Sequence, residues 1–135
     1  MSDKIKGSCQ CKAVKYEINP AVLLVGNCHC TICKKITGAS FSTIVIVAED
    51  DLSLVQGTDQ LSTWQVSDLA AKNFCCKCGT PIFNTNKKYP GRRMIYLGSF
   101  DDPQFTAPTV NVHCENMLPW VPSLGELKSF DQDMS

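Results

Sequence analysis

Three thiols lie within six residues in the run Cys28-His29-Cys30-Thr31-Ile32-Cys33. This C-x-C-x-x-C spacing lets three sulfurs converge on one metal ion while little chain has to be ordered. A closed structural zinc site takes four ligands, so the run is one ligand short. Zinc with an open coordination position is typical of catalytic sites. The run therefore predicts a catalytic zinc on Cys28, Cys30 and Cys33, with the fourth position left for water or a substrate sulfur.

A second closed structural site is the alternative. Cys114 is the one cysteine left to serve as a fourth ligand, and His29 and His113 could supply a nitrogen instead. Structural zinc is common and its ligands can come from any part of a chain. The sequence leaves both interpretations open.

The chemistry of zinc, together with two neighbouring lysines, supports a thiol as the incoming ligand. Zinc-bound thiols are deprotonated at neutral pH, and three thiolates on Zn²⁺ leave one net negative charge. Lys34 and Lys35 follow Cys33 directly. Both could offset this charge and meet a substrate carboxylate, although either lysine alone is also typical of a solvated helical turn.

Four other cysteines predict a separate, structural zinc site. Cys75-Cys76-Lys77-Cys78-Gly79 contains a C-x-x-C-G knuckle, in which the glycine permits the tight turn that frees amides to face the sulfurs. Cys9 and Cys11 are the natural partners, which gives a closed site on Cys9, Cys11, Cys75 and Cys78. Cys76 competes with Cys75, but knuckle geometry favours Cys75. We therefore expect two zinc ions per chain.

A disulfide scaffold would be the other explanation for nine cysteines. Their number is odd, eight of them lie in tight clusters, and no signal-type apolar segment precedes them. Neighbouring cysteines are poor disulfide partners because the geometry of the bridge is strict. A thioredoxin-like redox unit is disfavoured because no βαβ pattern appears.

The composition predicts one soluble domain. The chain has 135 residues, of which 44% are hydrophobic and 19% charged, and its net charge is zero. A nucleic-acid partner is not expected, because such proteins usually carry a basic excess. The longest apolar runs are far too short to span a membrane. We expect a cytoplasmic protein with a domain over residues 1–125 and a polar tail over 126–135. A homodimer is possible, but nothing in the sequence specifies one.

The elements that must position the cysteines are short strands. Lys12 to Ile18 alternates, with Val14, Tyr16 and Ile18 on its buried face. A single helical turn, ended by a glycine, is predicted over Lys34 to Gly38. Further strands are predicted at Ala21–Val25, which Gly26-Asn27 should end, and at 41–48, 52–56, 61–66, 82–84, 94–100 and 110–114. Such a pattern indicates a mainly β domain.

Taken together, these motifs resemble the glutathione-dependent formaldehyde-activating family, also called the centromere protein V/formaldehyde-activating domain. The resemblance rests on Gly7-Ser8-Cys9-Gln10-Cys11, on the central run with Lys34-Lys35, and on Phe74 to Pro81. Leu97 to Pro103, His113 and Trp120 fit the later part of the family pattern, so most of the chain is covered. Cys76 and Cys114 lie outside the pattern of seven cysteines.

The resemblance implies an Mss4-like β-tent, built of small antiparallel sheets around zinc sites with little helix. It implies a structural zinc on Cys9, Cys11, Cys75 and Cys78 and a catalytic zinc on Cys28, Cys30 and Cys33. The implied activity is that of a carbon–sulfur lyase of the S-(hydroxymethyl)glutathione synthase type, joining glutathione and formaldehyde reversibly.

Three residues are candidates to assist this reaction. His113 could act as general acid or base, because an imidazole titrates near neutrality, and a structural histidine is the alternative. Arg92 and Arg93 could hold the carboxylates of a peptide thiol, although arginines in a polar loop are often simply solvated. A non-catalytic interaction module with two structural zinc sites remains the alternative function.

Overall fold

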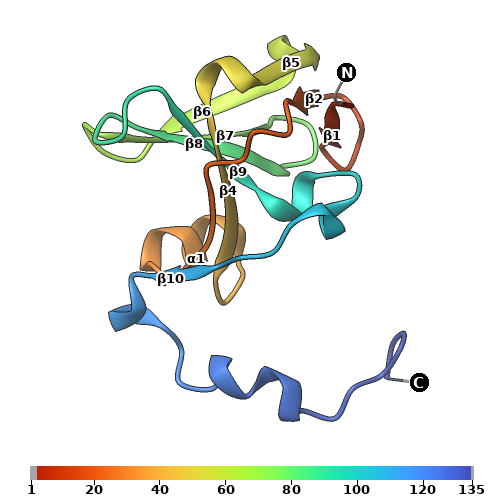
Figure 1. Cartoon of the computed structure of the whole chain (residues 1–135), viewed down its shortest axis with the longest axis vertical. Coiled ribbons are helices and arrows are strands. Elements are labelled where there is room, and N and C mark those ends of the chain that lie inside the picture. The colour runs from red at the N-terminus through yellow and green to blue at the C-terminus, as the bar shows by residue number, and fades with distance from the viewer. Residues whose placement is uncertain (1–2, 135) are drawn as a thin grey trace.

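The computed structural model describes residues 3–134 and is mainly β, with one short α-helix (Figure 1). Its elements are β1 (Ile5–Ser8), β2 (Lys15–Ile18), β3 (Leu24–Cys28), α1 (Thr31–Thr37), β4 (Ser42–Ala48), β5 (Leu52–Gln56), β6 (Leu61–Gln65), β7 (Ala70–Cys75), β8 (Pro81–Asn86), β9 (Arg92–Tyr96) and β10 (Val110–Val112). Short 3₁₀ turns lie between them. The predicted fold class is confirmed.

The strands form two sheets. A three-stranded sheet has the order β1-β2-β5, and a seven-stranded sheet has the order β10-β3-β4-β9-β8-β7-β6. The pairs are antiparallel, with one exception to the expected pattern: β10 runs parallel to β3. The parallel pair brings residues 110–112 beside the start of the tri-cysteine run, because Val112 faces Cys28 in the register.

The core lies between the two sheets. Val14, Tyr16 and Ile18 are fully buried, as the alternation in the sequence predicts. They pack in one cluster with apolar side chains of the large sheet, among them Val25, Val45, Val47, Phe83 and Ile95. Burying this much apolar surface is the main favourable contribution to folding.

The opposite face of the large sheet carries polar chemistry. Side chains alternate between the two faces of a strand, so residues directly paired across strands share a face. The register pairs Cys28 with Ser42, Ile44 with Tyr96, and Lys72 with Asn84. Cys28, Tyr96 and Lys72 each lie an odd number of residues from a core position of the same strand, namely Val25, Ile95 and Cys75. Cys28, Tyr96 and Lys72 therefore lie on the face away from the small sheet.

The strand predicted at Ala21–Val25 is displaced. The structure places β3 at Leu24–Cys28, so the chain continues as a strand through Gly26 and Asn27 instead of ending there. Pairing explains the difference, because β4 and β10 both bond to this segment and stabilise it from two sides. As a result, Cys28 is fixed at the end of a central strand and not in a free loop.

Two other segments also differ from the prediction. The strand predicted over 94–100 is β9, which begins at Arg92 and gives way to a 3₁₀ turn over Leu97–Ser99. The segment that ends at Cys75, for which the sequence predicts no strand, is strand β7 with both edges paired. β7 is thus an interior strand of the large sheet.

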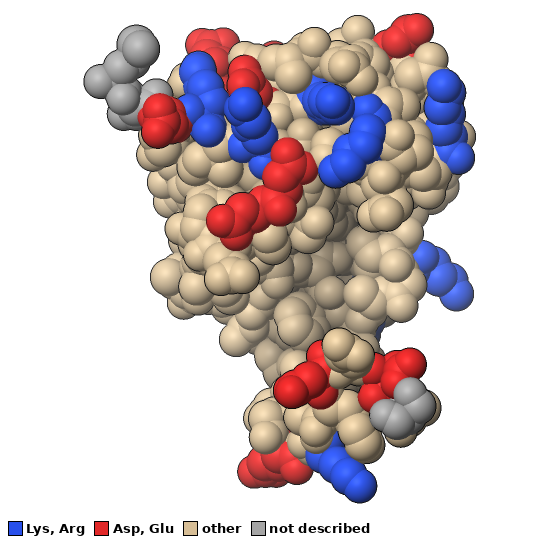
Figure 2. Space-filling view, turned by 90° about the vertical axis from the view of Figure 1, so that its right-hand side faces the viewer, with Lys and Arg blue, Asp and Glu red and all other residues tan. Residues whose placement is uncertain are grey.

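After β10 the chain leaves the sheets and runs beneath them as an extended segment with short 3₁₀ turns (Figure 1). Seen from the side, this segment forms the narrow lower part of the molecule (Figure 2). Several apolar side chains on it are exposed, including Trp120, Leu124, Leu127 and Phe130. The proposed domain boundary at residue 125 stays a prediction. Within the described residues, no helix combines the length and the apolar character needed to cross a membrane.

Candidate functional site

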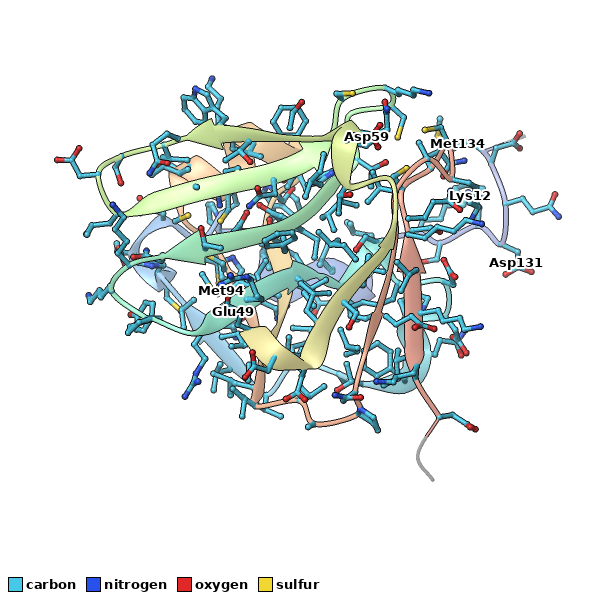
Figure 3. The ribbon with its side chains drawn as sticks, turned by 90° about the horizontal axis from the view of Figure 1, so that it is seen from above. Lys12, Glu49, Asp59, Met94, Asp131 and Met134 are labelled. Atoms are coloured by element: carbon cyan, nitrogen blue, oxygen red, sulfur yellow. The ribbon has the colours of Figure 1, made fainter. Side chains whose placement is uncertain are left out.

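The structure gathers four thiols at the junction of the two sheets. Cys9 and Cys11 follow β1, Cys75 ends β7, and Cys78 lies in the turn before β8. The four sulfurs all lie within 4.8 Å of one another. The Cys9 and Cys11 sulfurs are 3.6 Å apart, and those of Cys11 and Cys75 are 3.8 Å apart. We call these four residues the four-cysteine cluster; Figure 3 looks down on this side of the molecule, with Lys12 and Asp59 labelled on its loops.

The loop geometry around this cluster matches a zinc knuckle. Gly79 has φ 78°, a left-handed conformation that glycine adopts without steric cost. The amide of Lys77 points at the Cys75 sulfur at 3.4 Å, and the amide of Val14 points at the Cys9 sulfur at 3.2 Å. The competing thiol of Cys76 is exposed and lies 3.5 Å from the side-chain oxygen of Gln60, outside the cluster.

Three further thiols form the tri-cysteine cluster: Cys28 at the end of β3, Cys30 at the N-cap of α1, and Cys33 within α1. Their sulfurs also lie within 4.8 Å of one another, and those of Cys28 and Cys33 are 3.5 Å apart. The amide of Cys33 donates to the Cys30 sulfur at 3.2 Å. The helix starts here because the Cys30 sulfur acts as the cap that serine or aspartate usually provides. Gly38, with φ 69°, ends it.

The donor sets of both clusters fit zinc. With Zn–S bonds of about 2.3 Å and tetrahedral angles, neighbouring sulfurs stand roughly 3.8 Å apart. The sulfur–sulfur distances of 3.5–3.8 Å approach this value. Among residues 3–134, no fourth cysteine, histidine, aspartate or glutamate joins Cys28, Cys30 and Cys33 at ligand spacing. The two clusters thus offer four protein ligands and three, respectively.

The pKa values of Cys28 and Cys33 in the tri-cysteine cluster are shifted in opposite directions. A hydrogen bond from the Cys33 thiol lowers the pKa of Cys28 to about 5, and the nearby His113 acts in the same direction. The pKa of Cys33 is raised well above its usual value, first by this same bond to Cys28 and second by burial. One thiolate is therefore held by a neighbouring thiol, and a cation such as zinc would be needed to hold all three as thiolates.

The alternative fourth ligands lie elsewhere. His29 is buried, but its Nε2 is 3.0 Å from the side-chain oxygen of Asn111 and its ring packs against Phe41. His113 and Cys114 are exposed, and His113 Nδ1 lies 3.7 Å from a Glu115 carboxylate oxygen. None of the three belongs to the cluster.

The four basic residues predicted to bind substrate differ in their surroundings. Lys34 donates to the backbone oxygen of Asn116 at 2.6 Å, which ties α1 to the chain after β10, while Lys35 is exposed. Arg92 is exposed as well. Arg93 pairs with Glu49 at 2.7 Å and shares the sheet face of Ile95, opposite to Tyr96. The substrate-binding role of these residues stays a prediction.

Sequence reasoning missed a polar group behind the tri-cysteine cluster. The ammonium of Lys72 lies 3.7 Å from the Cys33 sulfur and 3.4 Å from the Tyr96 hydroxyl oxygen. Tyr96 in turn donates to the side-chain oxygen of Asn84 at 3.1 Å. All three side chains are buried. No local motif marks them, because the register of β7, β8 and β9 brings them together.

Comparison with known sequences gives a consistent family. The profile of the family described as "Glutathione-dependent formaldehyde-activating enzyme" matches residues 4–116. A protein of Halomonas elongata is 26% identical in an alignment of 138 residues, gaps included, that covers 96% of this chain and 84% of that protein. One of Pyrenophora teres f. teres is 31% identical over 109 residues, 73% of this chain and 57% of that protein. Both carry the name "Putative glutathione-dependent formaldehyde-activating enzyme".

A solved structure supports the fold. The crystal structure of a Rhodobacter sphaeroides protein superposes with a TM-score of 0.66 at 21% identity. The superposition covers 80% of this chain and all of the other. At this level of identity the likeness concerns the arrangement of the strands.

Proposed function

Since the chain belongs to the glutathione-dependent formaldehyde-activating enzyme family, we propose that it is a zinc-dependent carbon–sulfur lyase. Its substrate in this proposal is an adduct of glutathione, or of another thiol, with an aldehyde, such as S-hydroxymethylglutathione. The observation that carries the proposal is the tri-cysteine cluster, in which three sulfurs lie within 4.8 Å and no fourth side-chain ligand joins them among residues 3–134. A bound substrate sulfur would complete this set.

Zinc held by Cys28, Cys30 and Cys33 would lower the pKa of a bound thiol and polarise a carbonyl oxygen. The cysteines themselves fix the geometry. Cys28 is anchored in the sheet, whereas Cys30 and Cys33 are locked to each other by the first turn of α1. Rigid placement of this kind keeps a reacting thiol in line with its partner.

The chemistry is redox-neutral. In the forward direction the S–H proton leaves, the sulfur lone pair forms a C–S bond to the carbonyl carbon, and the carbonyl oxygen gains a proton. The reverse breaks the C–S bond and returns thiol and aldehyde. His113 is the proposed proton carrier, because it is exposed and close enough to Cys28 for its charge to lower the pKa of that thiol.

The carboxylates of the thiol are assigned in this proposal to the predicted basic residues. Lys34 and Lys35 on α1 are next in sequence to the cluster. Arg92 is exposed, and Arg93 would have to exchange its partner Glu49 for the substrate. Lys34 would likewise have to leave the Asn116 carbonyl.

The test is turnover measured against the uncatalysed reaction, because thiols add to formaldehyde unaided. Exchange between free and adduct glutathione is followed by NMR at increasing concentrations of protein. We expect acceleration by the wild type, loss of it in Cys30→Ser, and wild-type rates in the control Cys114→Ser, whose thiol lies outside both clusters. Absence of acceleration with glutathione and with other thiols, in protein that holds two zinc ions, would favour the non-catalytic zinc module.

A further inference from the structure

Lys72 is a buried lysine that neither the cysteine motifs nor the proposed reaction uses. It lies in β7 with only 7% of its surface exposed. A buried ammonium is costly unless an anion or good hydrogen-bond acceptors surround it. In the part of the chain that the structure describes, neither of the ion pairs Arg93–Glu49 and His113–Glu115 involves Lys72. The ionisable groups that Lys72 faces are the sulfur of Cys33, at 3.7 Å, and the hydroxyl of Tyr96, at 3.4 Å.

The position of the ammonium is fixed by two neighbouring strands. Asn84 accepts the hydroxyl hydrogen of Tyr96, so the oxygen lone pairs of Tyr96 remain for Lys72. The ammonium also lies 5.9 Å from the centre of the Tyr96 ring, within the range of a cation–π contact. Lys72 and Asn84 are directly paired across β7 and β8. The sheet therefore holds this charge against the cluster on rigid elements.

The charge balance shows what this arrangement does. Three thiolates and a Zn²⁺ ion leave one negative charge, which the Lys72 ammonium would cancel. A substrate thiolate would then raise the total to one negative charge instead of two. Because the ammonium is withdrawn from water, its effect on the sulfurs is stronger than that of an exposed lysine.

We propose that Lys72 is the built-in counter-charge of the tri-cysteine metal centre, positioned by Tyr96 and Asn84. It strengthens metal binding, weakens the donor strength of the Cys33 sulfur through an N–H···S bond, and lets the centre accept a thiolate as fourth ligand. Lys72 is a positioning residue, since it acts through Cys33. The inference rests on the proposed function in one respect, that the incoming ligand is a thiol.

The test uses Lys72→Met, which keeps a side chain of similar length and removes its charge. The full-length protein is prepared with zinc in the four-cysteine cluster and Co²⁺ in the tri-cysteine cluster. We expect the variant to bind Co²⁺ about 10- to 100-fold more weakly, which is the usual effect of removing a hydrogen-bond partner of a metal ligand. Its sulfur-to-cobalt charge-transfer band should move to lower energy, because the Cys33 sulfur no longer accepts a hydrogen bond from Lys72. Glutathione, added as the probe thiol, should bind the cobalt form more weakly by a similar factor.

Lys77→Met is the matched control. Lys77 stands between two cysteines of the other cluster, but it is exposed. Its replacement should leave the cobalt affinity, the absorption band and the glutathione titration unchanged. Unchanged values in Lys72→Met would overturn the inference.

A second variant covers the case in which Lys72→Met does not fold. Tyr96→Phe keeps the ammonium and removes the oxygen that holds it, so a smaller shift of the same band and a several-fold loss of affinity are expected. An unaltered band in Tyr96→Phe would then refute the proposal. The two proposals fail separately: absent turnover with an intact Lys72 effect defeats only the lyase, and normal turnover without that effect defeats only the counter-charge.

Discussion

The two cysteine clusters of this protein are built from the same donor and differ in how they are assembled. The four-cysteine cluster joins residues far apart in the chain, 64 positions in the contact of Cys11 with Cys75, and it connects the small sheet to the large one. The tri-cysteine cluster comes from six consecutive residues at a strand end and a helix start. In the proposed function, zinc in the first cluster would hold the two sheets together, and zinc in the second would keep one ligand position for the substrate.

The surroundings of the clusters reinforce this difference. Cys9 and Cys75 are fully buried and take part in the hydrophobic core. The tri-cysteine cluster lies on the other face of the large sheet, next to Lys72, Tyr96 and Asn84. The four-cysteine cluster thus joins two core thiols to the exposed thiols of Cys11 and Cys78, whereas the tri-cysteine cluster has a buried cation beside it.

The largest effect that the comparison predicts is global unfolding of Cys75→Ser. Structural zinc contributes about 10–16 kcal/mol of binding free energy in small domains, as much as the whole stability of a typical protein of about 5–15 kcal/mol. Circular dichroism and zinc content measure the result. Cys76→Ser is the control, since the neighbouring thiol is exposed and outside the cluster. A folded Cys75→Ser protein would show that the four-cysteine cluster is not needed to hold the fold together.

The second largest predicted effect is a difference in how readily the two clusters release zinc. Removing a hydrogen-bond partner of a metal ligand already weakens metal binding about 10- to 100-fold, so a site with one protein ligand fewer should bind at least about a hundredfold more weakly. A chromophoric chelator should therefore remove one zinc early, with no change in the circular dichroism spectrum, and the second only as the protein unfolds. Release of both ions in a single phase would make the two clusters equivalent.

A smaller effect concerns the pH dependence of thiol reactivity after the first zinc has been removed. The folded pKa of Cys28 is lowered to about 5, so its thiolate persists as the pH falls and is lost only near pH 5. Alkylation of Cys28 by iodoacetamide should hardly change between pH 8 and 6.5, whereas an ordinary thiol slows roughly twentyfold. Mass spectrometry of the labelled peptides gives the rates. An ordinary slope at Cys28 would contradict the hydrogen bond from Cys33.

The smallest effects come from two glycines, one beside each cluster. Gly38 ends α1 with φ 69° and Gly79 closes the knuckle with φ 78°, and at both positions an added Cβ would meet no atom within 4 Å. Alanine at either position should thus cost only backbone strain, about 1 kcal/mol.

The location of the loss should differ between the two variants. Gly79→Ala should lower the melting temperature of the whole protein, and Gly38→Ala should mainly weaken zinc in the tri-cysteine cluster. Gly98→Ala is the control, since this glycine has neither a positive φ nor a close neighbour. Equal effects of Gly79→Ala and Gly38→Ala on the melting temperature would contradict the different roles proposed for the two clusters.

Much of this was accessible from the sequence because the signals are local. The alternation around Tyr16 predicts a buried face, and the C-x-x-C-G spacing predicts the knuckle that Gly79 closes. The C-x-C-x-x-C spacing predicts the tri-cysteine cluster, and the first turn of α1 brings the Cys33 sulfur back beside those of Cys28 and Cys30. The geometry of both cysteine sets agrees with these predictions, while their role as zinc ligands stays a prediction.

What the sequence could not provide depends on register. Lys72 is close to Cys33 because β7, β8, β9 and β4 are neighbours in one sheet, and no spacing rule encodes that order. The extension of the strand through Gly26 likewise depends on β10, which comes from far along the chain and pairs in parallel. Long-range pairing of this kind overrides the local preference of glycine for turns.

Sequence separation also fixes the order in which the clusters can form as the chain is made. The tri-cysteine run needs only six neighbouring residues, so its sulfurs can gather once Cys33 has emerged, before any partner strand of β3 exists. The four-cysteine cluster must wait until Cys78 has been synthesised and a loop of more than 60 residues has closed, which is slow and entropically costly. A nascent chain that meets zinc would therefore bind it first at the tri-cysteine cluster and last at the four-cysteine cluster.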